Sequence, residues 1–342
     1  MPQPPLDIVK YLGTPLIPLR EQYPPGTGGT GPRADWAEGA LKGVEVIQDF
    51  EDKVNEYLKT VPTEPVRPHP AHKYPKFVQA RANLPSVLKS PADLQKCLST
   101  LPLAAISSVL TALDADPEDL EKAAPATHDK AGYESDGGEA VQEHEERSAQ
   151  PVDEGKTKAW FWHFSKSPMG SGEFLLMRQG SNEVKMVVRT INSSAFTPPD
   201  WDEYVATGPY NYNTKSKASW YWSRTWGATK RLGCHGWVLT DWQRWVFGCF
   251  DEGRTHGWVS PIMRFDARSP SIGQAMLYWA KSAMHDPNGF KPSPKDTASM
   301  PRIFPDNPAR RISVSGAKPR TPTAVKAANE SDIEESDVED AS

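Results

Sequence analysis

Three cations on one predicted helix have the residue types to hold phosphate. Arg224, Lys230 and Arg231 lie in or next to the stretch WYWSRTWGATKR, within a helix expected to run from Thr214 and to end at Gly233. Lysine and arginine neutralise phosphate oxygens, and tryptophans beside a basic groove can stack on bases. A solvated helix face and a tryptophan core are the commoner outcomes for these residue types, so both interpretations stay open.

A glycine-rich stretch, GTGGTG at residues 26–31, has the composition of a phosphate-binding loop but not its context. Such a loop needs a strand before it and a helix after it, so that backbone N–H groups converge on the phosphate. Pro24 and Pro25 precede the stretch and Pro32 follows it. These prolines favour a flexible loop.

The histidines and cysteines do not indicate a zinc site. The three cysteines are an odd number, and His163, His235 and His256 share no ligand spacing with them. This cysteine usage predicts an intracellular protein of the nucleus or the cytoplasm. No apolar run reaches the roughly 18 residues of a membrane span, so neither a membrane partner nor a signal peptide is expected.

The elements that position any site must come from the part of the chain that can form a core. Of the 12 tryptophans, only Trp36 lies outside residues 160–279, and 33 prolines with a mean hydropathy of −0.61 indicate polar segments elsewhere. The predicted divisions are a disordered segment over 1–34, an N-terminal helical region over 35–113, a disordered acidic linker over 114–158, an α+β domain over 159–290 and a disordered tail over 291–342.

The tail contains three candidate phosphorylation sites. Arg310 and Arg311 precede Ser313, as in basophilic kinase sites, and the stretch SDIEESDVED places acids just after Ser331 and Ser336, as in acidophilic sites. Phosphate on these serines would deepen a negative patch and alter docking to basic partners.

The N-terminal region is expected to be helical. Asp35 and Glu38 have the spacing of a capping box, and apolar residues recur every three or four positions from there to Val61, which predicts one helix over 35–61. Ser90 before Pro91 predicts the start of a second helix, and the run LAAISSVLTAL predicts a third.

From residue 160 the apolar period becomes that of strands. WFWHF, EFLLMRQ and NEVKMVVRTI predict an antiparallel meander with turns at PMGSG and QGSN. After the helix, GWVLTD and RWVFGCFDE predict a hairpin, THGWVSPIMRF predicts a third strand, and Ser269 with Pro270 predicts the start of a last helix. This order predicts an α+β fold in which a mixed sheet is flanked by helices.

The step from the helix into GCHGWVLTDWQRWVFGCF resembles the PD-(D/E)XK nuclease-like domain of a group of uncharacterised fungal proteins. The resemblance covers roughly residues 160–284 and rests on the hydrophobic order and on the hairpin VLTDWQRWVFG. It implies a restriction-endonuclease-like fold. In such nucleases an acid opens one strand and a Glu-x-Lys lies on the next. The two carboxylates hold Mg²⁺, and the lysine stabilises developing charge.

Two alignments to this pattern stay open. In the first, Glu173 replaces the usual aspartate, and Glu183 and Lys185 form the Glu-x-Lys on one face of the next strand. All three are then catalytic, and Glu173 and Glu183 bind the metal. In the second, which fits the hydrophobic pattern better, Arg189 and Ile191 replace the glutamate and the lysine. An arginine cannot bind Mg²⁺, so the second alignment implies a site without catalysis.

These alignments lead to two functional hypotheses. The preferred one is a catalytically degenerate binding or scaffold module, whose partner is a nucleic acid or a protein. The alternative is an active Mg²⁺-dependent nuclease. The residue that faces Glu173 across the two strands distinguishes them, because fold resemblance alone does not establish function. The oligomeric state stays open.

Overall fold

The computed structural model describes residues 5–23, 40–67, 74–115, 158–166, 172–210, 212–213 and 215–293. All of them belong to one compact unit, residues 1–303. The glycine-rich stretch 26–31, most of the predicted acidic linker, and Ser313, Ser331 and Ser336 lie outside the described residues.

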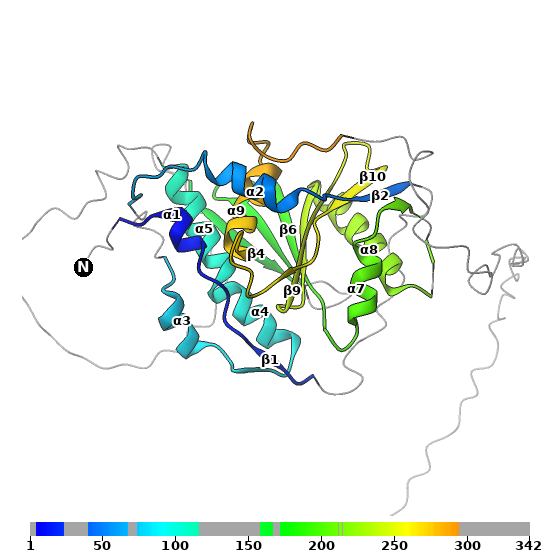
Figure 1. Ribbon diagram of the computed structural model, residues 1–342, viewed down its shortest axis with the longest axis horizontal. Coiled ribbons are helices and arrows are strands. Elements are labelled where there is room, and N and C mark those ends of the chain that lie inside the picture. Colours follow the sequence, from blue (N-terminus) through cyan, green and yellow to red (C-terminus); the bar gives the residue numbers. More distant parts are fainter. Residues whose placement is uncertain are drawn as a thin grey trace, which may run out of the picture. The chain divides into compact units, whose positions relative to one another are not determined.

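A mixed sheet of nine strands forms the centre of this unit (Figure 1). Its order is β4-β5-β6-β8-β9-β10-β2-β7, and β11 pairs with β9. The pairs β6–β8 and β10–β2 are parallel, and the other pairs are antiparallel. The strands are β2 (Gly43–Val46), β4 (Trp160–Ser165), β5 (Glu173–Arg178), β6 (Val184–Thr190), β7 (Gly208–Pro209), β8 (Gly236–Thr240), β9 (Arg244–Phe250), β10 (His256–Val259) and β11 (Met263–Arg264).

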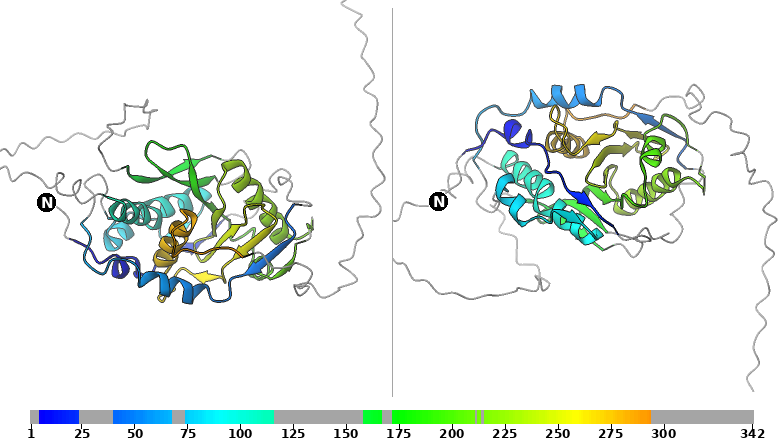
Figure 2. Two further views of the ribbon diagram at one scale, coloured as in Figure 1. Left: turned by 90° about the horizontal axis from the view of Figure 1, so that it is seen from above. Right: turned by 60° about the horizontal axis from the view of Figure 1, so that its bottom comes forward.

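Helices cover both faces of the sheet, and each face has its own hydrophobic core (Figure 1, Figure 2). The larger core includes side chains of α1 (Ile8–Leu12), α2 (Phe50–Leu58), α3 (Phe77–Asn83), α4 (Pro91–Thr100), α5 (Pro102–Leu113) and α9 (Ile272–Ala283). The smaller core includes side chains of α7 (Pro198–Tyr204) and α8 (Lys217–Leu232). A short parallel pair, β1 (Arg20–Glu21) and β3 (Val87–Leu88), forms a second sheet. The predicted α+β architecture is therefore confirmed.

The elements predicted from residue 160 onward are confirmed with small shifts. β4, β5 and β6 form the meander, and β8 and β9 form the hairpin. The helix α8 ends at Gly233, whose φ of 70° is a left-handed conformation that glycine adopts without strain. The helix α9 begins two residues later than predicted: its N-cap is Ser271, not Ser269, because the Ser271 side chain accepts a hydrogen bond from the backbone of Gln274.

The predicted helix over 35–61 is wrong in its first part. Gly43–Val46 form β2, which pairs in parallel with β10, and α2 begins only at Phe50. Val44 and Val46 pack in the core on the α8 side of the sheet. The apolar spacing suits a helix locally, but a strand partner more than 200 residues away decides the conformation.

Residues 5–23, which were expected to be disordered, contain α1 and β1 and pack against α9. Ile8 and Leu12 are fully buried. The Ser271 hydroxyl donates to Leu12 O at 2.5 Å, and the Gln274 amide donates to Val9 O at 3.0 Å. The order of this segment therefore depends on a helix at the other end of the unit.

A β-bulge in β6 changes which face of the sheet its residues occupy. Met186 pairs with Leu176, and Val184 pairs with the next residue of β5, so Lys185 is the extra residue of the bulge. As a result, Val184 and Val187 both pack in the core on the α8 side, whereas Met186 packs on the α9 side.

One helical stretch among the described residues, Pro91–Leu113, is long and apolar enough to cross a membrane, so the expectation that no apolar run reaches this length is wrong. It comprises α4 and α5, and 72% of its most apolar window is buried inside the protein. A core helix of a folded domain has the same length and composition, and the burial of this stretch agrees with that role.

Candidate functional site

Glu173 and Arg189 face each other across β5 and β6 and form an ion pair. They are partners in the strand register, and Arg189 Nε lies 3.1 Å from Glu173 Oε1. Arg231, at the end of α8, places its Nη2 3.1 Å from Glu173 Oε2. Arg189 Nη1 also donates to the Thr225 hydroxyl at 3.2 Å. One carboxylate is therefore held between two guanidinium groups.

This Arg189–Glu173–Arg231 triad is mostly buried. The side chains of Glu173 and Arg189 are 4% and 10% exposed, whereas that of Arg231 is 52% exposed. Burying a charge costs several kcal/mol per ion, and only close pairing with further hydrogen bonds offsets that cost. The two buried members of the triad therefore depend on each other.

The structure does not bring Glu183 and Lys185 to this triad. Glu183 lies just before β6, at the opposite end of the β5–β6 pair from Glu173. Glu173 and Glu183 are about 17 Å apart along the strands, at about 3.4 Å per residue. Lys185 lies in a cleft with residues of α9, on the face of the sheet opposite to Arg189. Glu183 and Lys185 form an ion pair with each other, but Glu183 lies before β6 and Lys185 is the bulge residue.

The residues around Glu173 do not fit Mg²⁺. This ion needs six oxygen ligands at about 2.0–2.1 Å, yet each carboxylate oxygen of Glu173 already pairs with a guanidinium nitrogen. In the part of the chain that the structure describes, no group of three or more His, Cys, Asp or Glu side chains could hold a metal ion. The alignment in which Glu173 and Glu183 share an ion disagrees with the β5–β6 register, because Arg189 is the residue that faces Glu173.

The cations of α8 do not surround one phosphate position. Arg224 lies over the Trp220 ring at 4.4 Å, and Lys230 lies over the Trp226 ring at 4.8 Å. Arg231 belongs to the triad. Most of the described tryptophans are buried, so the core interpretation of these side chains is confirmed; Trp220 is among the few that are partly exposed.

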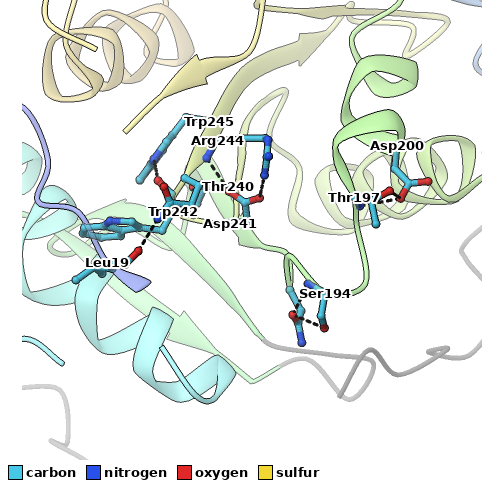
Figure 3. A network of polar contacts seen from close by, with 11 residues as sticks. Leu19, Ser194, Thr197, Asp200, Thr240, Asp241, Trp242, Arg244 and Trp245 are labelled. Carbon is cyan, nitrogen blue, oxygen red and sulfur yellow. Dashed lines mark hydrogen bonds and ion pairs between the residues drawn. The ribbon is translucent and has the colours of Figure 1, made fainter. Parts of the chain in front are cut away.

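A second polar network lies at the carboxyl end of β8, in the turn that leads into β9 (Figure 3). Asp241 is fully buried, and its carboxylate accepts hydrogen bonds from the backbone of Arg244 at 2.6 Å and from its Nη1 at 3.1 Å. Trp242 has a φ of 78°, and its indole donates to Ile17 O at 2.9 Å. The turn therefore holds the N-terminal segment against the sheet.

Glu21 of β1 is a second carboxyl group near this turn. Burial raises the pKa of Glu21 to about 7; the negative charge of Asp241 raises it as well, while Ser193 and Arg244 oppose the shift. Burial also raises the pKa of Asp241. The Glu21 carboxyl group therefore keeps its proton in mildly acidic solution.

We expect Glu21 to make the protein less stable as the pH rises toward neutrality. An unfolded glutamate ionises near about pH 4.3, so above that pH the unfolded state releases a proton that the folded state retains. The stabilisation of the fold by protonated Glu21 is complete below the pKa of glutamate in the unfolded chain. It is lost as the pH rises through the folded pKa of Glu21, about 7. Thermal denaturation from about pH 5 to about pH 8 should show a smaller fall in Tm for Glu21→Gln than for the wild type. Equal falls would contradict this assignment, and Glu183→Gln, at an exposed carboxylate, is the control.

Glu183 and Lys185 line a separate cleft at the remote end of β5 and β6. Asp114, at the end of α5, and Lys281, from α9, line the same cleft, as does Arg178 at the end of β5. The sequence reasoning did not identify Asp114, Arg178 or Lys281 as site residues. They come from three separated elements, so no local spacing marks them.

No protein-family model matches this sequence, and the comparisons with curated proteins and with solved structures found no match. Functional inference therefore depends on the geometry of these residues.

Proposed function

We propose that this protein is a non-catalytic binding module built on a restriction-endonuclease-like core. The observation that carries this proposal is the ion pair between Glu173 and Arg189. In a PD-(D/E)XK nuclease, the acid of one strand and the Glu-x-Lys of the next hold one metal ion, so they must face each other. Here the residues in the facing positions are Arg189 and, two residues on, the buried Ile191.

The guanidinium group of Arg189 supplies the positive charge that a metal ion would otherwise bring to Glu173. A carboxylate in this position needs a positive neighbour because it is buried, whether that neighbour is an ion or a side chain. The order of a meander, a helical connection and a parallel fourth strand, β4-β5-β6-α8-β8, also supports the proposed core.

The partner of this module is a protein or a nucleic acid. Lys230 is exposed at the end of α8, beside the triad member Arg231, whose side chain is 52% exposed. Exposed cations beside a degenerate site favour an acidic partner, since complementary charge steers association.

The proposal predicts that the full-length chain neither binds Mg²⁺ or Mn²⁺ in a saturable way nor nicks plasmid DNA. Calorimetric titration and a nicking assay on the wild type and on Glu183→Ala test it, and the two proteins are expected to behave alike. The full chain is needed because β2 and the N-terminal helices belong to the same sheet and core. Nicking that depends on the metal and disappears in Glu173→Ala or Glu183→Ala would establish the nuclease instead.

A further inference from the structure

A charged cleft lies between the ends of β4–β6 and the C-terminal ends of α5 and α9. Its volume is about 520 Å³, which is in the range of about 300–1,000 Å³ typical of small-molecule sites. Its lining includes four cations, Lys158, Arg178, Lys185 and Lys281, and three carboxylates, Asp114, Glu183 and Asp286.

Two of the four cations are already neutralised within the cleft. Lys281 Nζ lies 2.7 Å from Asp114 Oδ1, and both side chains are mostly buried. The second oxygen of Asp114 accepts a hydrogen bond from the Trp160 indole at 2.7 Å. Lys185 forms its ion pair with Glu183. The buried Asp114–Lys281 pair and the more exposed Glu183–Lys185 pair therefore form one polar wall of the cleft.

The other two cations, Lys158 and Arg178, have no carboxylate within ion-pair distance among the residues that the structure describes. Arg178 Nε donates to Lys158 O at 3.2 Å, and the guanidinium group lies over the Trp160 ring at 5.7 Å. No described residue accepts a hydrogen bond from the two terminal nitrogens of Arg178. The guanidinium is therefore oriented by its neighbours while its outer edge stays available.

We propose that this cleft binds a small molecule that carries a phosphate group, with Arg178 and Lys158 as the phosphate ligands. The planar guanidinium edge of Arg178 matches two phosphate oxygens, and the Lys158 ammonium adds a mobile point charge. A phosphate monoester carries a charge of about −1.5 to −2 near neutral pH. Lys158 and Arg178, which pair with no carboxylate in the described part of the chain, attract this charge, and Asp286 in the same cleft opposes it.

Asp286 gives the cleft a second recognition element. Its Oδ1 accepts a hydrogen bond from the backbone of Asn288 at 2.9 Å, and no cation in the described ranges pairs with it. A carboxylate in this position accepts a hydrogen bond from a hydroxyl or amino group. The ligand class is therefore a phosphorylated small molecule with a donor group, such as a sugar phosphate.

This site is independent of the proposed function. Arg178 and Glu173 lie at opposite ends of β5, about 17 Å apart at about 3.4 Å per residue, and the cleft is on the α9 side of the sheet. A nuclease-like module and a phosphate site can each be disproved without the other, because Glu173→Ala lies outside the cleft, and Arg178→Gln and Lys158→Gln lie outside the triad. Glu183→Ala changes a residue that lines the cleft, so it does not separate the two.

Isothermal titration of the full-length protein with inorganic phosphate, ribose 5-phosphate and succinate tests the proposal, with ionic strength matched by sodium chloride. Both phosphates are expected to bind at one saturable site, with ribose 5-phosphate the tighter, and succinate is expected to bind at least about tenfold more weakly. Arg178→Gln and Lys158→Gln should each weaken phosphate binding by about tenfold or more. Lys59→Gln, an exposed cation of another element, is the control and should change nothing.

Three results would overturn the proposal. The first is that titration with phosphate gives no saturable heat of binding, and the second is that succinate binds as tightly as phosphate. The third is that Arg178→Gln and Lys158→Gln both bind phosphate as the wild type does. Arg178→Gln also removes a contact with Trp160, so its fold is checked by circular dichroism. Lys158→Gln provides the same test without that contact.

Discussion

Replacing Glu173 with glutamine is expected to lower the free energy of unfolding by about 3–5 kcal/mol. Glutamine keeps the size and shape of the side chain but removes the charge that Arg189 and Arg231 share. The Arg189 side chain is only 10% exposed, so its guanidinium would stay buried without a counter-charge. Urea denaturation of the full chain measures the loss.

Two matched variants separate this effect from a general loss of charge. Glu183→Gln breaks an ion pair whose carboxylate is 63% exposed, and it should cost less than about 1 kcal/mol. The double variant Glu173→Leu with Arg189→Met exchanges both buried charges for apolar groups and should recover most of the stability. If Glu173→Gln costs no more than Glu183→Gln, the triad does not stabilise the fold.

Replacing Trp279 with alanine is expected to cost about 3–5 kcal/mol. Trp279 is 1% exposed, and its indole donates to Gly248 O at 3.0 Å and to Trp237 O at 3.2 Å. These two carbonyls belong to the neighbouring strands β8 and β9, so one side chain of α9 connects the helix to both. The ring also packs on Phe50 at 5.7 Å. The variant would leave a large cavity and would remove the indole N–H that donates to both carbonyl oxygens.

Trp220→Ala is the control for this prediction. Trp220 is partly exposed on α8, where Arg224 covers its ring at 4.4 Å. Its removal should cost about 1 kcal/mol, because little buried volume is lost. Thermal denaturation of both variants provides the comparison. Equal losses in Tm would show that the contact between α9 and the sheet does not carry the stability that its burial implies.

The triad also explains how Glu173 can stay buried at the start of β5. A buried carboxylate at the start of β5 is costly unless a positive group lies beside it. Arg189 and Arg231 provide that group from two separate elements. The nicking assay tests separately whether the proposed function, a module without catalysis, is correct.

Local sequence patterns were sufficient for most elements after residue 160. The strands β4, β5, β6, β8 and β9 follow their apolar stretches, and α8 ends where Gly233 permits a left-handed conformation. Ser90 and Pro91 start α4, as predicted, and the structure shows a capping box between Ser90 and Asp93 that was not predicted. These features depend on the spacing of apolar side chains along the chain and on helix-capping residues. Both are set by residues close together in the sequence.

Long-range pairing corrected one sequence prediction and decided between two alignments. Gly43–Val46 became a strand because β10 lies beside it, against a helical spacing in its own segment. The partner of Glu173 became Arg189 and not Glu183, because the antiparallel register places the end of β6 opposite the start of β5. Strand register is a contact between segments, and apolar spacing within one segment does not encode it.

The sequence by itself therefore determined an α+β fold, the position of its tryptophan core and the candidate residues Glu173, Glu183, Lys185 and Arg189, but not Arg178 or Lys281 of the cleft. The tertiary structure alone decided which of them meet. The bulge at Lys185 turned it toward the cleft on the α9 side, and α8 brought Arg231 to Glu173 from 58 residues away. The physical reason is that charge pairing and bulges depend on the geometry of neighbouring elements, which forms only when the whole sheet is assembled.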